Sequence, residues 1–217
     1  RNVCWTVECL KAAFDLDNYA GKRIVSYLPM AHIAERMMSH YQQLFMGYEV
    51  TCCPDPTQIA EYAREIHPNI MFGVPRVWEK IQARMEAVGA TSGPLKRRLA
   101  RWARRVGLES GYAAQRGDPP VRGYGLANRL VFGKVRQKLG LDRAEFLITA
   151  AAPVALDTLE FFLSLDMPIL EVYGMTECSG PGTFSRPDRY RTGAAGVAIP
   201  GTEVRLTEDG EVCMRGP

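Results

Sequence analysis

One stretch of the chain predicts the fold: Ile169-Leu170-Glu171-Val172-Tyr173-Gly174-Met175-Thr176-Glu177-Cys178-Ser179-Gly180-Pro181-Gly182. It begins as a short apolar run that ends in an aromatic residue, which is the pattern of a buried strand. It then changes abruptly to glycine, threonine, glutamate and serine. In an open α/β sheet such a change falls at the carboxyl end of a strand, where ligands bind. A strand followed by an ordinary polar loop is the alternative that the spacing alone leaves open.

The residues after the apolar run suit a nucleotide. Gly174 allows the backbone to approach a ligand closely, and the Thr176 hydroxyl can donate a hydrogen bond to a phosphate oxygen. The Glu177 carboxylate is a hard oxygen ligand of the kind that Mg²⁺ prefers. Tyr173 offers the face of its ring to a base. We therefore expect a nucleotide and a divalent cation at the end of this strand.

Length and composition set the class of protein. The 217 residues can bury a sizeable core of one or two domains, and the 47% apolar and 24% charged fractions are typical of a soluble globular protein. A formal net charge of +3 is too small to indicate a nucleic-acid partner. No run of 18 apolar residues occurs, so no membrane-spanning helix is expected. The six cysteines form no C-x-x-C pair and include adjacent Cys52 and Cys53, which favours reduced thiols in a cytoplasmic protein.

Strand-like runs and helical periodicities alternate along the chain. Helical spacing or capping signals occupy residues 2–16, 31–45, 55–66, 126–139 and 156–165 and a segment that begins at Pro75. Strand-like runs occupy residues 24–28, 48–52, 69–73 and 145–149 and the run that begins at Ile169. This alternation predicts an α/β fold with a mostly parallel sheet covered by helices. A polar loop is expected after Gly182, and Asp209-Gly210 between two strand-like runs predicts a β-hairpin at the C-terminal end.

Residues 91–125 differ in character from the rest of the chain. One helical stripe is apolar, and the other face is strongly basic, with Leu95, Leu99, Trp102 and Val106 on the first and Lys96, Arg97, Arg98, Arg101, Arg104 and Arg105 on the second. Basic amphipathic helices can lie on anionic membranes. A solvated surface helix is the usual explanation of such a pattern, and peripheral membrane contact near residues 95–106 is the second hypothesis.

A second predicted strand end lies upstream, at Thr149-Ala150-Ala151-Ala152-Pro153. Its small side chains leave space for a flat ring to lie against the backbone, and Tyr173 could cover the other face of that ring. Taken alone, an alanine-rich turn is usually tight packing. Because the carboxyl ends of parallel strands share one edge of a sheet, the two segments together predict a single crevice.

These motifs resemble a known family. The segment at residues 173–177 is similar to the Tyr-Gly-x-Thr-Glu signature of the adenylate-forming superfamily, which includes acyl-CoA synthetases, luciferases and peptide-synthetase adenylation domains. Residues 161–165 and 179–181 resemble the long-chain acyl-CoA synthetases, particularly their bubblegum-type branch. Residues 149–154 are similar to the family's Ser-Gly-Ala-Ala-Pro-Leu, in which Thr149, Ala150 and Val154 replace the serine, the first glycine and the leucine.

The resemblance implies roles for individual residues. It assigns the nucleotide site to Ala151, Ala152, Pro153, Tyr173, Gly174, Met175 and Thr176, and catalysis to Thr176 and Glu177, with Glu177 holding the metal. Residues 27–36 resemble the family's Tyr-Leu-Pro-Leu-Ala-His-Ile-x-Glu-Arg, which assigns His32 to the acyl pocket without a proton-transfer role. From the residues alone, His32 could face a cleft or be a structural side chain. Residues 72–81 look like the family segment that borders the fatty-acid tunnel.

The resemblance also implies an activity. We expect residues 1–200 to be the α/β core of an AMP-binding domain, with 91–125 a basic helical insertion, and residues 201–217 to begin a following β subdomain. The expected reaction is ATP- and Mg²⁺-dependent activation of a long-chain fatty acid to an acyl-adenylate, followed by thioester formation with CoA. An aryl-CoA ligase, a luciferase-like enzyme and a non-catalytic nucleotide- or acyl-binding fragment are the alternatives.

The ends of the chain are interpreted as cuts through a larger protein. The family's Ser/Thr-Gly-rich phosphate loop is expected just before Arg1, its ribose-binding aspartate just after Pro217, and its catalytic lysine in a further domain. No G-x-x-x-x-G-K-[ST] or G-x-G-x-x-G occurs here as a substitute. Residues 1–217 by themselves are therefore expected to show no turnover.

Overall fold

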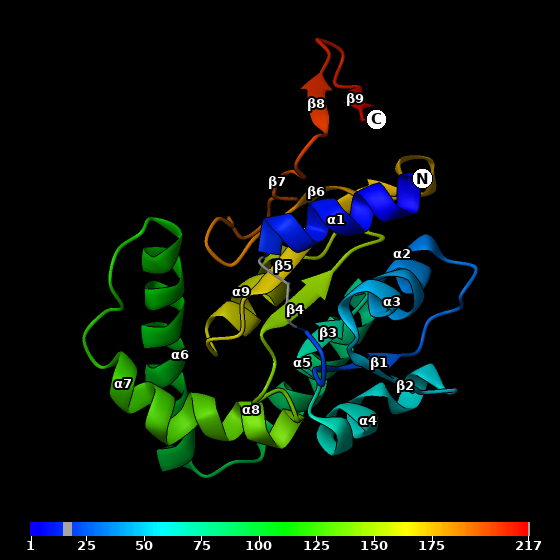
Figure 1. The fold of residues 1–217 in the computed structure, drawn as a ribbon. Coiled ribbons are helices and arrows are strands. Elements are labelled where there is room, and N and C mark those ends of the chain that lie inside the picture. Colours follow the sequence, from blue (N-terminus) through cyan, green and yellow to red (C-terminus); the bar gives the residue numbers. More distant parts are fainter. Residues whose placement is uncertain (15–18, 217) are drawn as a thin grey trace.

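A seven-stranded sheet runs through the molecule in the order β2-β1-β3-β4-β5-β6-β7 (Figure 1). The computed structural model describes residues 1–14 and 19–216. The strands are β1 (Arg23–Ser26), β2 (Glu49–Cys52), β3 (Ile70–Phe72), β4 (Phe146–Thr149), β5 (Ile169–Met175), β6 (Gly180–Phe184) and β7 (Val197–Ala198). β1 to β5 pair in parallel, and β6 and β7 add antiparallel pairs. The mostly parallel sheet expected from the sequence is confirmed.

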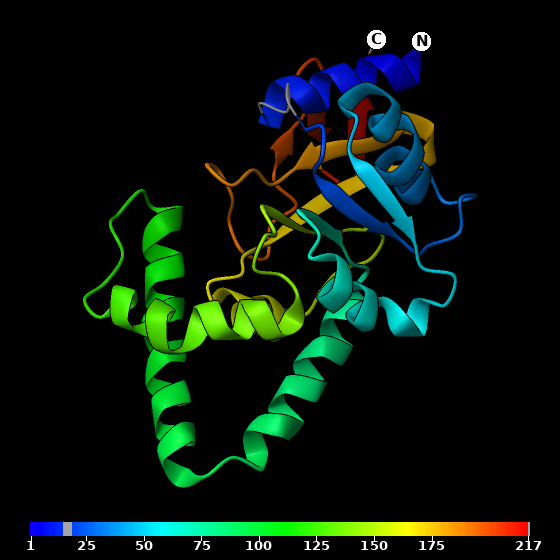
Figure 2. The same cartoon turned by 60° about the horizontal axis from the view of Figure 1, so that its bottom comes forward.

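Helices cover both faces of this sheet (Figures 1 and 2). One face carries α1 (Asn2–Phe14) and a continuous helix made of α2 (Ile33–Arg36), the π-helical turn η1 (Met37–Tyr41) and α3 (Gln42–Met46). The other face carries α4 (Ile59–Ile66), preceded by the 3₁₀ turn η2 (Pro56–Gln58), together with α5 (Pro75–Ala90), α8 (Gly133–Leu139) and α9 (Leu156–Leu163). Two layers of helices explain why the strands are apolar on both faces.

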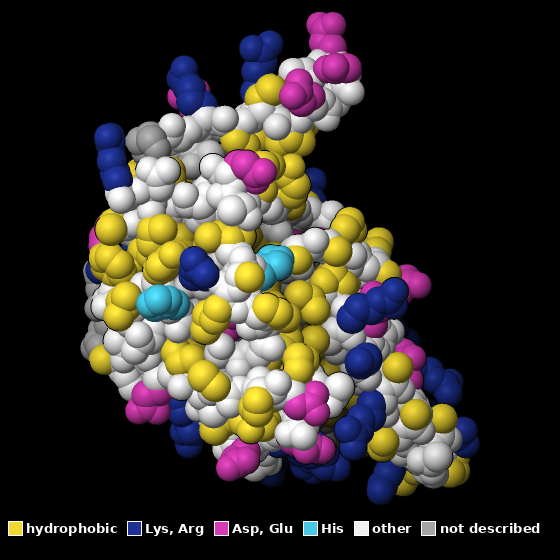
Figure 3. Space-filling view, turned by 90° about the vertical axis from the view of Figure 1, so that its right-hand side faces the viewer, with side chains coloured by type: hydrophobic (Ala, Val, Ile, Leu, Met, Phe, Trp, Pro, Cys, Tyr) yellow, Lys and Arg dark blue, Asp and Glu magenta, His cyan; other side chains and the backbone are white. Residues whose placement is uncertain are grey.

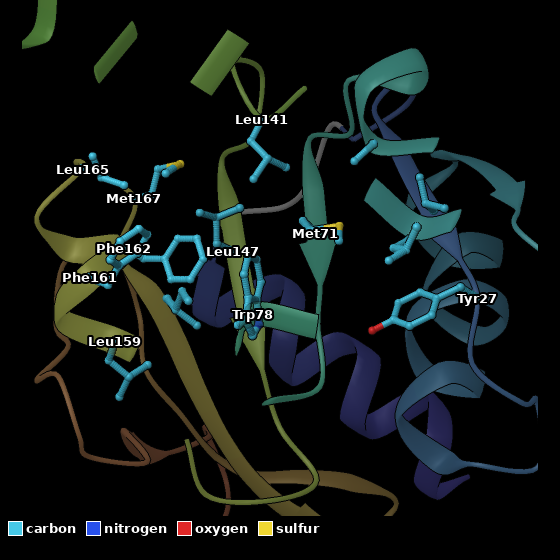
Figure 4. Close-up of a cluster of buried hydrophobic side chains, with 14 of the residues drawn as sticks. Tyr27, Met71, Trp78, Leu141, Leu147, Leu159, Phe161, Phe162, Leu165 and Met167 are labelled. Atoms are coloured by element: carbon cyan, nitrogen blue, oxygen red, sulfur yellow. The ribbon is translucent and has the colours of Figure 1, made fainter. Parts of the chain in front are cut away.

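Two hydrophobic clusters flank the sheet: the first lies under α1 and the helix from α2 to α3, and the second lies under α5, α8 and α9 (Figure 4). Side chains alternate along β4, so Ile148 packs under α1 while Leu147 joins this second cluster. Trp78 is fully buried there, and its indole N–H donates to the Gly73 carbonyl at 2.9 Å. That bond ties the first turn of α5 to the end of β3, at the edge of the sheet where the predicted site residues lie.

A long helical hairpin projects beyond the sheet (Figure 2). α5 ends at Ala90, α6 covers Pro94–Gln115, and α7 (Tyr124–Ala127) continues through the π-helical turn η3 (Asn128–Phe132) into α8. The helix predicted around residues 95–106 is part of α6, and its apolar stripe faces solvent at its beginning, where Leu95 is 80% exposed. Only the second half of α6 reaches the body of the protein, where Gly107 allows close packing against the end of α9: a β-carbon there would lie 2.2 Å from the Ser164 carbonyl oxygen.

The polar loop predicted after Gly182 begins two residues later, at Ser185. β6 continues to Phe184 and pairs antiparallel with β5, with alternate residues buried. Its Gly-Pro-Gly composition hides this alternation in the sequence, whereas Phe184 is only 7% exposed and packs on the first cluster. The predicted C-terminal hairpin is confirmed as β8 (Glu203–Leu206) paired with β9 (Val212–Arg215). A domain boundary near residue 200 stays a prediction.

Candidate functional site

The two predicted strand ends meet at the carboxyl edge of the sheet. β4 and β5 are parallel neighbours, and Thr149 pairs in register with Glu171. Residues 150–153 leave the sheet after β4, beside residues 172–175, which continue β5 and pair with β6. Ala151, Ala152, Pro153 and Tyr173 are all exposed there, and 39% of Tyr173 is accessible. The structure thus presents small side chains and an accessible aromatic ring at the same edge of the sheet.

A cavity of about 70 Å³ opens at this edge of the sheet. Its sheet side is formed by Ala150, Ala151, Val172 and Gly174, and its helical side includes His32, Met37 and Gln42. The third wall comes from β6 and includes Pro181 and Phe184. The structure therefore brings His32, which the sequence assigns to an acyl pocket, to the same cavity as two residues assigned to the nucleotide.

His32 has a structural role as well as its place at the cavity. It is the N-cap of α2, and its Nδ1 accepts a hydrogen bond from the Ala34 N–H at 3.2 Å. That bond orients the ring and leaves Nε2 for another partner. The helix consequently begins two residues later than the sequence predicts, because the β-region backbone of His32 is that of a cap.

The loop between β1 and α2 is held by charged side chains. Glu35 is 2% exposed and accepts hydrogen bonds from the Ser39 hydroxyl and from the Leu28 N–H, the latter at 3.3 Å. Arg36 donates from Nε to the Met30 carbonyl at 2.9 Å. Both side chains therefore fix the loop backbone that presents His32, and they contribute to the site by positioning rather than by contact.

Backbone strain is concentrated near this edge of the sheet. Ala151 has a φ of 76° and Ser179 a φ of 61°, so two of the four non-glycine residues with positive φ in the described part of the chain lie here. An L-residue in the left-handed region costs roughly 1–2 kcal/mol. Strain of this kind clusters at ligand sites, where the surrounding structure holds it in place. In Ala151 it turns the chain directly after β4, where Ala151 lines the cavity with Val172 and Gly174 of β5.

Gly174 is explained by packing within the sheet. A β-carbon at this position would lie 2.0 Å from the Gly180 carbonyl oxygen and 2.7 Å from the Pro181 α-carbon. The pairing of β5 with β6 is irregular between Tyr173 and Gly174, and the two backbones approach closely just after that point. The structure thus supplies a reason for glycine that is independent of the ligand approach inferred from the sequence.

Glu177 lies on a short turn just beyond β5. Thr176–Cys178 form a 3₁₀ turn (η4), in which the Met175 N–H donates to the Cys178 sulfur at 3.3 Å and that thiol donates back to the Met175 carbonyl at 3.2 Å. Thr176 and Glu177 are both exposed. In the described residues no group of three or more His, Cys, Asp or Glu side chains could hold a metal ion. Glu177 therefore offers a single carboxylate.

Several residues at the site were not singled out from the sequence. Phe184 and Pro181 belong to β6, a strand that the sequence analysis did not predict. The sequence indicates Glu171 only as a residue of a strand. In the structure its carboxylate accepts a hydrogen bond from the Gly193 N–H at 2.7 Å. Burial raises the pKa of Glu171, and the N–H groups of Gly193 and Ala194 partly oppose that rise. The side chain ties the loop at 193–194 to the strand that carries the site.

The fold and this edge of the sheet define an AMP-binding enzyme. All of the chain, residues 1–217, matches the AMP-binding enzyme family, and the chain belongs to that family. It is 43% identical over 215 residues to the long-chain-fatty-acid–CoA ligase ACSBG2 of Xenopus laevis, covering 94% of this chain and 29% of that protein. It is 40% identical over 226 residues to ACSBG2 of Gallus gallus, covering 99% of this chain and 30% of that protein. The resemblance to long-chain acyl-CoA synthetases is confirmed, and the chain spans less than a third of the length of these relatives.

Solved structures share the fold at low sequence identity. Apo MatB from Rhodopseudomonas palustris superposes with a TM-score of 0.60 and 20% identity over all of this chain and 34% of that one. The o-succinylbenzoate CoA synthetase MenE from Bacillus subtilis, in complex with its acyl-adenylate intermediate, gives a TM-score of 0.62 and 14% identity, covering 98% of this chain and 33% of that one. The expected fold, part of the large domain of an adenylate-forming enzyme, is confirmed.

Proposed function

We propose that the protein containing this chain activates long-chain fatty acids with ATP and transfers them to CoA. A carboxylate oxygen attacks the α-phosphorus of ATP and expels pyrophosphate, which leaves an acyl-adenylate. The CoA thiol then attacks the acyl carbonyl, and AMP leaves. The observation that carries the proposal is the shared carboxyl edge of β4 and β5, where one mainly apolar cavity is lined by His32, Ala151 and Gly174. The names of the relatives support the substrate class.

The nucleotide is proposed to lie between the two strand ends. Adenine would rest on the backbone and small side chains of Ala151, Ala152 and Pro153, with the exposed Tyr173 ring over its other face. Gly174 and Met175 continue β5 alongside the base, and the exposed Thr176 hydroxyl can donate to a phosphate oxygen. The strained turn at Ala151 supports this placement, because it shapes the wall that the ring would contact.

Glu177 is proposed as the protein ligand of Mg²⁺. A single exposed carboxylate fits this ion, which is commonly held by one or two carboxylates together with substrate phosphates and water. When bound, Mg²⁺ supplies positive charge that offsets the repulsion between the carboxylate and the triphosphate. The Cys178 thiol, by closing the turn on Met175, holds the Glu177 backbone just beyond β5.

Replacing Glu177 by alanine in the intact protein tests this function. We expect fatty-acid-dependent exchange of pyrophosphate into ATP to be lost while the melting temperature is unchanged, because Glu177 is exposed. The matched control is Glu208→Ala, another exposed glutamate, in the turn of the β8–β9 hairpin. Full exchange activity in Glu177→Ala would refute the role of Glu177. Exchange with aryl acids but not with long-chain fatty acids would instead indicate an aryl-CoA ligase.

We also propose a cytoplasmic protein that contacts anionic membranes through the first half of α6. Among the helices of residues 1–14 and 19–216, none has the length and apolar character that crossing a bilayer requires. The end of the hairpin projects from the body and carries gathered Lys and Arg side chains (Figures 2 and 3). Val88 and Leu95 are 65% and 80% exposed there, and no acidic residue occurs between residues 91 and 108. Such a surface combines apolar insertion with attraction to anionic lipid.

Cosedimentation with vesicles tests the membrane contact. Binding to vesicles that contain phosphatidylserine is expected to fall sharply when Arg97, Arg98 and Arg101 are changed to glutamate. Arg104 is left intact, because it donates to Ser164 at 2.9 Å and lies 4.5 Å from the centre of the Phe161 ring. Reversal of the exposed residues Arg191 and Arg205 serves as the control. Equal binding by the α6 variant would overturn the proposal.

A further inference from the structure

The side chain of Gln42 is unusual among those that line the cavity. It is 6% exposed, and its neighbours at the cavity are mainly apolar, including Met38, Ile148 and Phe184. Within the described part of the chain, its amide makes no hydrogen bond. Among the side-chain N and O atoms of the described residues, only Thr149 Oγ1 is fully buried without a hydrogen-bond partner. The amide atoms of Gln42 therefore keep some accessible surface, and a ligand in the cavity that Gln42 lines could bond to them.

The π-helical turn η1 is what directs Gln42 into the cavity. The Gln42 N–H donates to the Met37 carbonyl, so the two residues are joined by an i to i+5 hydrogen bond. In a regular α-helix, residues five apart point in directions that differ by roughly 140°. Here both Met37 and Gln42 line the cavity. Single π-helical turns are rare and frequently occur at functional sites.

Gln42 lies at the junction of two cavities. The first, of about 70 Å³, opens at the carboxyl edge of the sheet beside His32 and Ala151. The second, of about 30 Å³, is lined by Ile70 and Phe146 at the beginnings of β3 and β4. Both share Leu10, Met38, Gln42, Ile148 and Phe184 as lining residues. A chain that entered from the edge and followed this face of the sheet would pass the Gln42 amide part-way along.

We infer that Gln42 determines specificity by hydrogen-bonding a polar group carried part-way along the acyl chain, so that the site prefers hydroxylated fatty acids. This inference rests on the proposed function and names its substrate class. A hydroxyl group can both donate to the amide oxygen and accept from the amide nitrogen. An unsubstituted chain would leave the amide unpaired, and sites built to hydrogen-bond a substrate discriminate against analogues that lack the group.

The test compares the kcat/KM of the intact protein for octadecanoic acid with that for its monohydroxylated positional isomers. Wild type is expected to favour at least one isomer over the unsubstituted acid, and Gln42→Met to lower that ratio about tenfold, as expected for one lost hydrogen bond. Gln42→Met is also expected to use octadecanoic acid better. The matched control is Gln43→Met, because Gln43 is the next residue, is half-buried and lines neither cavity. Gln42→Leu is a second apolar variant.

The outcomes separate this inference from the function on which it rests. Activation of fatty acids with the same isomer ratio in wild type and Gln42→Met would overturn the role of Gln42 and leave the proposed function standing. Failure of wild type to activate any fatty acid would overturn the proposed function and the inference with it. Failure of both Gln42 variants to fold, measured by thermal unfolding beside Gln43→Met, would show that the amide is structural and would also overturn the inference.

Discussion

Replacing Gly174 by alanine should destabilise the protein by about 3 kcal/mol. The new β-carbon would lie 2.0 Å from the Gly180 carbonyl oxygen and 2.8 Å from the carbon of that group. Ordinary contacts between such atoms begin at about 3.5 Å, so the backbone of β6 must retreat by roughly 1.5 Å. A flexible side chain could move aside, but the obstacle here is backbone that is itself paired with β5.

The magnitude follows from the contacts that this retreat disturbs. The affected part of the ladder pairs Gly174 with Pro181 and Met175 with Gly180. Weakening about two backbone hydrogen bonds costs roughly 2 kcal/mol, and overpacking adds about 1 kcal/mol or more. For a protein of this size, 3 kcal/mol corresponds to a fall in melting temperature of about 6–12 °C.

Thermal unfolding of Gly174→Ala beside Gly89→Ala provides the assay. Gly89 lies in α5, and a β-carbon added there would meet nothing within 4 Å beyond the backbone of its own helix. The same chemical change at Gly89 should therefore stabilise the protein by about 0.5–1 kcal/mol. A melting temperature of Gly174→Ala within one or two degrees of wild type would refute the packing explanation. If binding of an acyl-adenylate analogue were lost at that unchanged melting temperature, Gly174 would serve ligand approach alone.

Three further perturbations test other parts of the structure. His32→Ala should raise the KM for the fatty acid more than the KM for ATP, and the reverse order would contradict the assignment to the acyl cavity. Loss of the helix cap should also lower the stability of the folded protein by about 1 kcal/mol. Asn69→Ala should cost about 1–3 kcal/mol in urea unfolding, because the amide accepts from the Arg23 N–H at 3.1 Å and donates to the Arg143 carbonyl at 3.2 Å. Burial raises the pKa of Glu171, so the folded state binds that proton more tightly and wild type loses stability as pH rises through the elevated pKa. The melting temperature of Glu171→Gln relative to wild type should therefore rise with pH. A fall would show that folding lowers the pKa of Glu171 instead of raising it.

Much of the fold could be predicted because its signals are local. Apolar runs and helical spacing predicted β1 to β5 and most helices to within a few residues of their observed bounds. Asp55 caps the turn at Pro56, as its residue type suggests, and accepts a hydrogen bond from the Thr57 N–H at 2.9 Å. The parallel arrangement followed from the alternation of strands and helices. Because parallel neighbours end at one edge, the adjacency of the carboxyl ends of β4 and β5 could also be predicted.

Other features depend on residues that are distant in the sequence. The strand β6 consists largely of glycine and proline, and it is a strand because β5 offers an edge on which Phe184 can be buried. The exposure of Leu95 depends on how far α6 extends past the sheet. Neither outcome is visible in local periodicity, since the same pattern could pack against a neighbour or face water.

By itself, the sequence determined the kind of fold, the family and the identities of the groups at the edge of the sheet. The tertiary structure decided their geometry: the left-handed turn at Ala151, the close contact at Gly174 and the π-helical turn that directs Gln42 inward. The physical reason is that secondary structure and turn chemistry are encoded by neighbouring residues. Distances between strands, and the direction of a side chain on a distorted helix, arise only when separate segments pack together.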